Sequence, residues 1–281
     1  MALSVLTNTA SLNAQKNLTA SQDMLSSSIS KLSSGMRINK AGDDAAGLGI
    51  SESLKAQVRS FSQASRNAND AISMSQVAEG GMNEMQGIVS RMRELSVQAA
   101  NDTLGSDERG YIHTEFTQLS KEVDRISKVT NFNGKNVLDG SNSQLTFQVG
   151  IFNTSDDRIT MSIGKLSTST LGTTATGGKI THASLSTAAK AQAAIGTFDA
   201  AIKGLSAARA KVGATQNRLS VTVSNLATSH ENLSAANSRI RDVDVASESA
   251  QLTKAQILSQ AGLAVLSQAN QIPQSALSLL R

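Results

Sequence analysis

The sequence predicts a mainly α-helical protein, an elongated α-helical coiled-coil bundle with a small β-hairpin region. Three observations lead to this prediction. A heptad pattern of apolar residues continues without interruption from Ile195 to Ile240, aromatic residues make up only 2% of the 281 residues, and proline occurs once. A core with so few aromatic side chains must be aliphatic, and long helical seams suit such a core better than a compact globule does.

The longest predicted helix covers residues 195–240. Counting alternately three and four residues from Ile195 reaches fourteen positions, of which ten are apolar. A helix of this length measures about 69 Å at 1.5 Å per residue, and its narrow seam needs partner helices along the whole length. The positions are Ile195, Phe198, Ile202, Leu205, Arg209, Val212, Gln216, Leu219, Val223, Leu226, His230, Leu233, Asn237 and Ile240.

The N-terminal half supplies the partner helices. Apolar residues recur at helical spacing in 54–72, 82–99 and 112–126. We expect the first two segments to form one helix that begins near Ser51 and continues almost to Ala100, and the third to open at Ser106 and Asp107. The methionines among these positions are interpreted as residues that fill gaps in the core.

A further helix is predicted near each end of the chain. The helix near the N-terminus has a narrow apolar stripe. In the helix near the C-terminus, residues 261–266 are almost fully apolar. Pro273 is expected to break the second helix before a short turn from Ser275 to Arg281. Because neither helix can bury its stripe alone, we expect the two to pair and to need further copies of the pair, so that they become ordered on assembly.

Two features separate the predicted helices in the middle of the chain. Leu145, Phe147 and Val149 alternate with polar residues, as do Ile159, Met161 and Ile163, which predicts an antiparallel hairpin within about 131–165. Residues 167–187 then contain mostly Thr, Ser, Gly and Ala. This composition predicts an exposed connection.

No pattern in the sequence predicts an enzyme, a metal site or a cofactor. His113, His182 and His230 lie on separate segments, and there is no cysteine. The glycine-rich stretch 41–51 lacks the lysine of a phosphate-binding loop, so Asp43 and Asp44 are better interpreted as groups at a helix start.

The charge pattern and the hydropathy pattern exclude two further classes of partner. The net charge is +4, but Lys and Arg are scattered among Asp and Glu, so we expect no nucleic-acid binding. No segment has the roughly 20 apolar residues of a membrane span, and the first residues do not resemble a cleaved signal peptide. We therefore expect no membrane insertion.

Four segments, 27–51, 92–102, 130–140 and 254–281, resemble the bacterial flagellins. The resemblance implies an extracellular filament subunit that is exported through the flagellar type III apparatus and polymerises with itself. It implies paired inner-core helices in 1–43 and 242–281 around which 44–241 forms an outer tube, in a short form without variable outer domains. An export chaperone and cap or junction proteins are the other implied partners. The alternatives are a hook–filament junction protein and a helical type III secreted tip protein.

Two sets of contact residues follow from these patterns. The predicted contacts in the filament core are Leu18, Leu25, Ile29, Leu32, Ile257, Ala261, Leu263, Val265 and Leu266. The resemblance also implies that a Toll-like receptor of animal hosts recognises Arg91, Leu95 and Glu115. The alternative for this second set is that Leu95 lies in the bundle seam and Arg91 pairs with a neighbouring acid.

Overall fold

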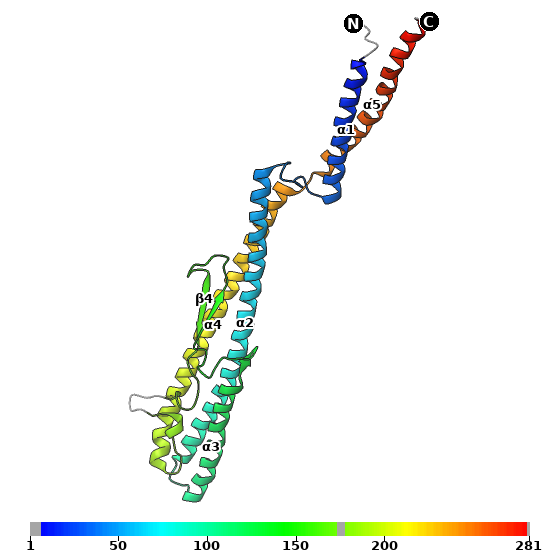
Figure 1. Cartoon of the computed structure of the whole chain (residues 1–281). Coiled ribbons are helices and arrows are strands. Elements are labelled where there is room, and N and C mark those ends of the chain that lie inside the picture. Colours follow the sequence, from blue (N-terminus) through cyan, green and yellow to red (C-terminus); the bar gives the residue numbers. More distant parts are fainter. Residues whose placement is uncertain (1–6, 173–177, 280–281) are drawn as a thin grey trace. The chain divides into compact units, whose positions relative to one another are not determined.

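The computed structural model describes residues 7–172 and 178–279, and Figure 1 shows the order of its elements along the chain. Long helices dominate these ranges, and two small antiparallel sheets interrupt them. The elements are α1 (Thr9–Ser34), α2 (Ala45–Ala99), α3 (Ser106–Val129), β1 (Asn131–Phe132), β2 (Lys135–Asn136), β3 (Gln144–Gln148), β4 (Arg158–Ser162), the 3₁₀ turn η1 (Ile180–His182), α4 (Ala188–Arg241) and α5 (Val245–Leu279). The mainly α fold class is confirmed.

The chain divides into two compact units. One unit contains residues 1–58 and 231–281, and the other contains residues 59–230. The division falls inside α2 and α4, whereas the predicted boundaries at 43/44 and 241/242 lie close to the breaks between helices. The assignment of these parts to an inner core and an outer tube remains a prediction.

The core of the 59–230 unit follows the heptad pattern of α4. Every seventh residue from Phe198 is buried, and α2 contributes a row of buried methionines with Val89 to the same core. The predicted seam is therefore the buried face of α4 within this unit. The buried seam residues are Phe198, Leu205, Val212, Leu219 and Leu226.

Polar side chains set the register between α2 and α4. Arg209 donates to Gln86 Oε1 at 2.8 Å, and Gln216 donates to Glu79 Oε2 at 3.2 Å. Both pairs join seam positions of α4 to α2, so sliding one helix along the other would leave half-buried polar groups without partners.

The third helix of this unit, α3, packs on both long helices. It begins at Ser106 as predicted, and Ile112, Phe116 and Val123 on one of its faces are buried. The ring of Phe116 meets the ring of Phe198 edge to face, with 5.9 Å between centroids. Aromatic pairs favour this geometry.

The predicted hairpin is confirmed as the β3–β4 pair. Leu145 lies opposite Met161 and Phe147 lies opposite Ile159, so the alternating apolar side chains share one face. A second, shorter hairpin joins β1 to β2. Its turn is Asn133–Gly134, with φ of 49° and 77°. Asn and Gly are the residues that tolerate such angles best.

The prediction that 167–187 is an exposed connection is wrong for most of its described residues. Thr168, Leu171, Ile180 and Leu185 are buried, and three of these join the main core. Asp124 accepts hydrogen bonds from both the amide and the hydroxyl of Thr168, each at 2.9 Å. A few apolar residues and one carboxylate suffice to anchor a polar segment. Residues 173–177 lie outside the described ranges.

Two helix ends differ from the prediction. The second helix begins at Ala45 rather than near Ser51, because Asp44 accepts a hydrogen bond from the amide of Gly47 at 2.8 Å and caps the helix. At the other end, α5 continues through Pro273 to Leu279. Proline removes one backbone hydrogen bond of a helix but has the helical φ, so it can weaken a helix without ending it.

Candidate assembly surface

In the unit of residues 1–58 and 231–281, α1 and α5 lie side by side (Figure 1). Small residues allow the backbones of α1 and α5 to approach each other closely. A Cβ atom added at Gly262 would lie 3.3 Å from Leu18 Cδ1. The Asn8 side chain accepts from the amide of Ser11, which caps α1, and donates to the carbonyl of Ala269 at 2.8 Å, which ties α1 to α5. The pair therefore buries chiefly small side chains.

Main-chain hydrogen bonds join the two chain breaks of this unit. The amide of Arg37 donates to the carbonyl of Arg241 at 2.6 Å, and the amide of Val243 donates to the carbonyl of Gly35 at 3.1 Å. The Arg241 guanidinium also pairs with Glu52. These contacts hold the end of α1 against the start of α5.

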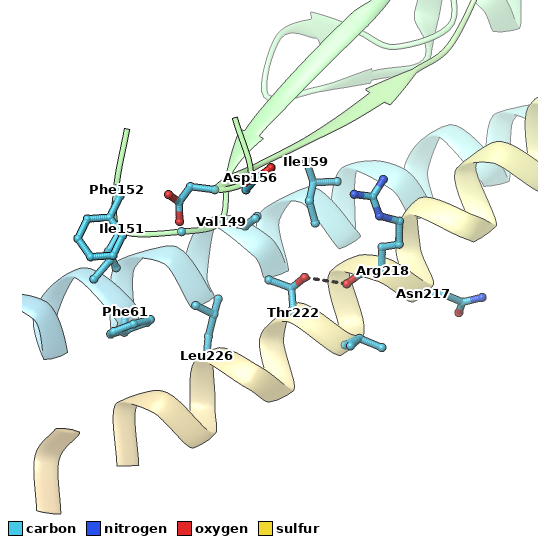
Figure 2. Close-up of a pocket in the computed structure, with 13 residues that line it drawn as sticks. Phe61, Val149, Ile151, Phe152, Asp156, Ile159, Asn217, Arg218, Thr222 and Leu226 are labelled. Carbon is cyan, nitrogen blue, oxygen red and sulfur yellow. Dashed lines mark hydrogen bonds between the residues drawn. The ribbon is translucent and has the colours of Figure 1, made fainter. Parts of the chain in front are cut away.

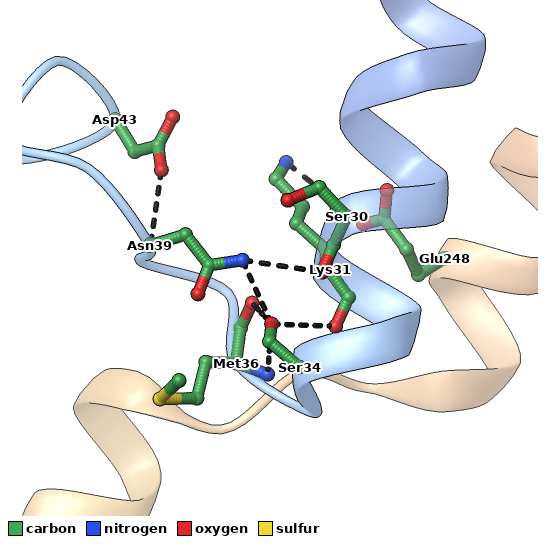
Figure 3. A network of polar contacts seen from close by, with 7 residues as sticks. All are labelled: Ser30, Lys31, Ser34, Met36, Asn39, Asp43 and Glu248. Carbon is green, nitrogen blue, oxygen red and sulfur yellow. Dashed lines mark hydrogen bonds and ion pairs between the residues drawn. The ribbon is translucent and has the colours of Figure 1, made fainter.

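A polar network fills the loop between α1 and α2 (Figure 3). Asn39 donates to Ser34 Oγ at 2.7 Å, and Asp43 accepts from the amides of Asn39 and Lys40, each at 2.9 Å. The amide of Lys40, followed by that of Asn39, holds the pKa of Asp43 below its usual value. Because Asp43 already occupies these amides, the loop does not form a phosphate cradle.

Both helices of the α1–α5 pair carry large apolar side chains that are exposed in the single chain. Ile29 on α1 is 52% exposed and Ile257 on α5 is 61% exposed, and further large apolar residues of both helices are exposed with them. We call this set the terminal apolar face. It comprises Leu12, Met24, Ile29, Val245, Ile257, Leu258, Leu263 and Val265. So many large apolar side chains left exposed on one pair of helices indicate a surface that other molecules cover.

The predicted core contacts fall into three groups. Leu18 is buried within the chain itself. The side chains of Leu25, Leu32 and Leu266 are half-buried. The remaining predicted residues, Ile29, Ile257, Ala261, Leu263 and Val265, are exposed in the single chain.

Sequence reasoning did not include Leu12, Met24, Val245 and Leu258 of the terminal apolar face. Leu12 and Met24 stand in a background of Ser, Asn, Gln and Thr, as the predicted leucines of that helix do. This contrast between a large apolar residue and polar neighbours was a usable signal. The buried alanines Ala255 and Ala269 carried no such signal, because alanine is common on every face of these helices.

The structure brings together two of the three predicted receptor residues. Arg91 Nε lies 3.0 Å from Glu115 Oε1, Arg91 Nη1 lies 3.2 Å from Glu94 Oε2, and all three side chains are exposed. Glu115, followed by Glu94, raises the pKa of Arg91. Leu95 is only 1% exposed and belongs to the main core. Its assignment to a surface hot spot is wrong, because its side chain packs inside the bundle.

The histidine in α3 has a structural contact. His113 Nδ1 accepts from the amide of Leu185 at 3.4 Å, and its ring stacks on Phe116. Within residues 7–172 and 178–279, no three metal-ligating side chains form a group that could hold an ion. The helices of the same ranges are too short or too polar to cross a membrane.

Long paired helices with exposed apolar side chains are typical of a structural subunit that assembles with other copies. Residues 5–143 match the bacterial flagellin N-terminal helical region, and residues 195–280 match the bacterial flagellin C-terminal helical region. The chain belongs to the bacterial flagellin family. It is a structural subunit of the flagellar filament, which is extracellular.

Relatives of known name agree with this assignment over nearly the whole chain. The chain is 43% identical to a flagellin of Halalkalibacterium halodurans over 98% of each chain, and 47% identical to a flagellin of Xenorhabdus nematophila over 100% of each. These relatives favour a filament subunit over a hook–filament junction protein. A putative flagellar hook-associated protein from Vibrio parahaemolyticus has the same fold, with a TM-score of 0.59 and 13% identity over 71% of this chain and 100% of that one.

Proposed function

We propose that the terminal apolar face is the surface through which each subunit contacts other copies in the core of the filament. The observation that carries this proposal is the exposure of large apolar residues on both helices of one pair, with Ile29 on α1 and Ile257 on α5. A filament supplies a cover of this kind along its whole length, because open helical symmetry repeats the same heterologous contact in every subunit.

The proposal includes the ordering of α1 and α5 during assembly. Fixing the backbone of one residue costs roughly 1–2 kcal/mol. The α1–α5 pair buries chiefly small side chains and leaves its large ones exposed, so a single subunit gains little from forming it. Covering the terminal apolar face by neighbouring copies supplies the missing stabilisation.

Limited trypsin digestion tests the ordering. We expect cleavage at Lys16 and Lys254, which are exposed in α1 and α5, to be fast in soluble subunits and slow in filaments. Lys211 is the matched control, because it is exposed on α4 within the 59–230 unit and should resist in both states. If the soluble subunit protects all three lysines equally, the terminal helices are already ordered and the proposal is wrong.

We propose that an export chaperone binds the exposed apolar residues of α5 before secretion, and that cap and junction proteins contact them at the two ends of the filament. The support is again the exposure of Ile257, Leu263 and Val265 in the single chain.

A second proposed partner is a Toll-like receptor of animal hosts, which would recognise the exposed Arg91–Glu115 pair. Arginine is enriched among the residues that carry most of the binding energy at protein interfaces. In a reporter assay with depolymerised protein, Arg91→Ala is expected to lower potency about tenfold. Arg125→Ala is the matched control, because Arg125 forms a similar exposed pair with Glu122. Equal potency of both variants would exclude Arg91 from recognition.

A further inference from the structure

A second exposed apolar surface lies in the 59–230 unit. Helices α2 and α4 and the loop of the β3–β4 hairpin enclose a groove of about 620 Å³ (Figure 2). Its floor is apolar, and Arg218 of α4 and Asp156 of the hairpin loop also line it. We call this surface the hairpin groove. Its apolar lining includes Phe61, Val149, Phe152, Ile159, Val221 and Leu226.

The composition of the hairpin groove matches that of a protein interface. Phe152 is 63% exposed, and Val221 is exposed to a similar extent. The side chains of Arg218 and Asp156 make no hydrogen bond or ion pair with the other described residues. An apolar centre that meets solvent, with charged groups of both signs available beside it, is the arrangement that another protein surface covers.

We propose that the hairpin groove receives the start of α3 from a second copy of this chain in the filament, with Tyr111 entering the apolar floor and Glu108 facing Arg218. Among the described large apolar residues, Tyr111 is the most exposed, at 76%. Glu108 precedes it by three residues on the same side of α3, is exposed and makes no ion pair with the described residues.

Charge complementarity supports this occupant. The start of α3 presents the acidic residues Asp107 and Glu108 beside Tyr111, and the groove presents the Arg218 guanidinium beside its apolar floor. The two faces are different surfaces of one subunit, as the heterologous contact of an open helical polymer requires.

The same chain cannot make this contact with itself. Next to the groove, Gln216 of α4 bonds Glu79 of α2. At the start of α3, Arg109 bonds the carbonyl of Ala99 at the end of α2. Twenty residues of one continuous helix separate Glu79 from Ala99, which is about 30 Å at 1.5 Å per residue. Any approach of Tyr111 to the hairpin groove therefore takes place between copies.

Cross-linking between two single-cysteine variants tests the contact directly, because the chain has no cysteine of its own. Filaments grown from a mixture of Tyr111→Cys and Phe152→Cys subunits, with wild-type subunits in excess to support assembly, are treated with a short bismaleimide. We expect covalent dimers from the mixed filaments, and none from soluble protein or from filaments that contain one variant.

Val129→Cys mixed with Phe152→Cys is the control, because Val129 is exposed in the same unit but does not line the groove. It should give no dimers. Mixed filaments of the Tyr111 and Phe152 variants without dimers would overturn the proposal. Dimers from filaments of one variant alone would also overturn it, because they would indicate that identical faces meet.

Charge reversal gives an independent readout. Arg218→Glu and Glu108→Arg are each expected to raise the critical concentration for assembly about threefold to tenfold, and the double variant should return it close to the wild-type value. If the two increases in critical concentration combine in the double variant instead of cancelling, Arg218 and Glu108 do not pair. None of these variants alters the terminal apolar face, so the trypsin test of the terminal helices can fail or succeed separately.

Discussion

Truncation of Leu263 to alanine is expected to raise the critical concentration for filament growth by about 30-fold. Truncating a buried leucine typically costs at least about 2 kcal/mol, and about 1.4 kcal/mol corresponds to a factor of ten in an equilibrium constant. Leu263 lies on the terminal apolar face and is exposed in the single chain. We expect Leu263 to become buried only in the filament, so the substitution should weaken the association of subunits and leave the stability of the single chain unchanged.

The measurement is the concentration of soluble subunit that remains at equilibrium with filaments, followed by sedimentation. The melting of the 59–230 unit should not change, because Leu263 lies in the other unit. Gln260→Ala is the control, since it shortens an exposed polar side chain of the same helix. Leu266→Ala is less decisive, because Leu266 is already half-buried in the single chain. Normal assembly of the Leu263 variant would show that this residue is not at a subunit contact.

Truncation of Phe198 to alanine is expected to destabilise the 59–230 unit by about 3–5 kcal/mol, the usual cost of removing a buried aromatic ring. Phe198 has no exposed surface and packs edge to face on Phe116. Removing its ring leaves a cavity among α2, α3 and α4, which do not collapse easily because polar pairs such as Arg209–Gln86 hold their register.

Urea unfolding of the soluble subunit, followed by far-ultraviolet circular dichroism, measures this loss as a lower midpoint at an unchanged slope. Val97→Ala is the control, because Val97 is exposed on α2 of the same unit and should change the free energy of unfolding by less than about 0.5 kcal/mol. A similar small change for Phe198→Ala would show that Phe198 does not anchor the core.

The long helices and the hairpin were predictable because their apolar residues recur at a fixed spacing. The buried residues of α4 from Phe198 to Leu226 recur at every seventh position, and a helix converts that spacing directly into one face. The β3–β4 hairpin followed in the same way from the alternation of apolar residues such as Leu145 and Met161. The exposed residues of α5, such as Ile257 and Val265, were predictable because the sequence of one subunit offers no partner for them.

Single contacts between distant segments were not predictable. The exposed Arg91 lies four residues before Leu95, and the buried Met92 lies three residues before it. Because helical spacing places Leu95 near both, spacing alone did not decide whether its side chain is buried. The burial of Thr168 depends on Asp124, which lies 44 residues earlier in the chain. No local pattern encodes such a pair.

The sequence by itself determined the helical class of this flagellin, the seam of its longest helices and the hairpin, because each of these depends on local periodicity. The tertiary structure alone decided which faces remain open. It placed Leu95 inside the bundle and Leu18 between α1 and α5, and it brought Phe152 of the hairpin loop beside Val221 of α4 to form the hairpin groove. Burial of a side chain depends on what other segments place against it, and such long-range packing has no signature in the spacing of residues along one helix.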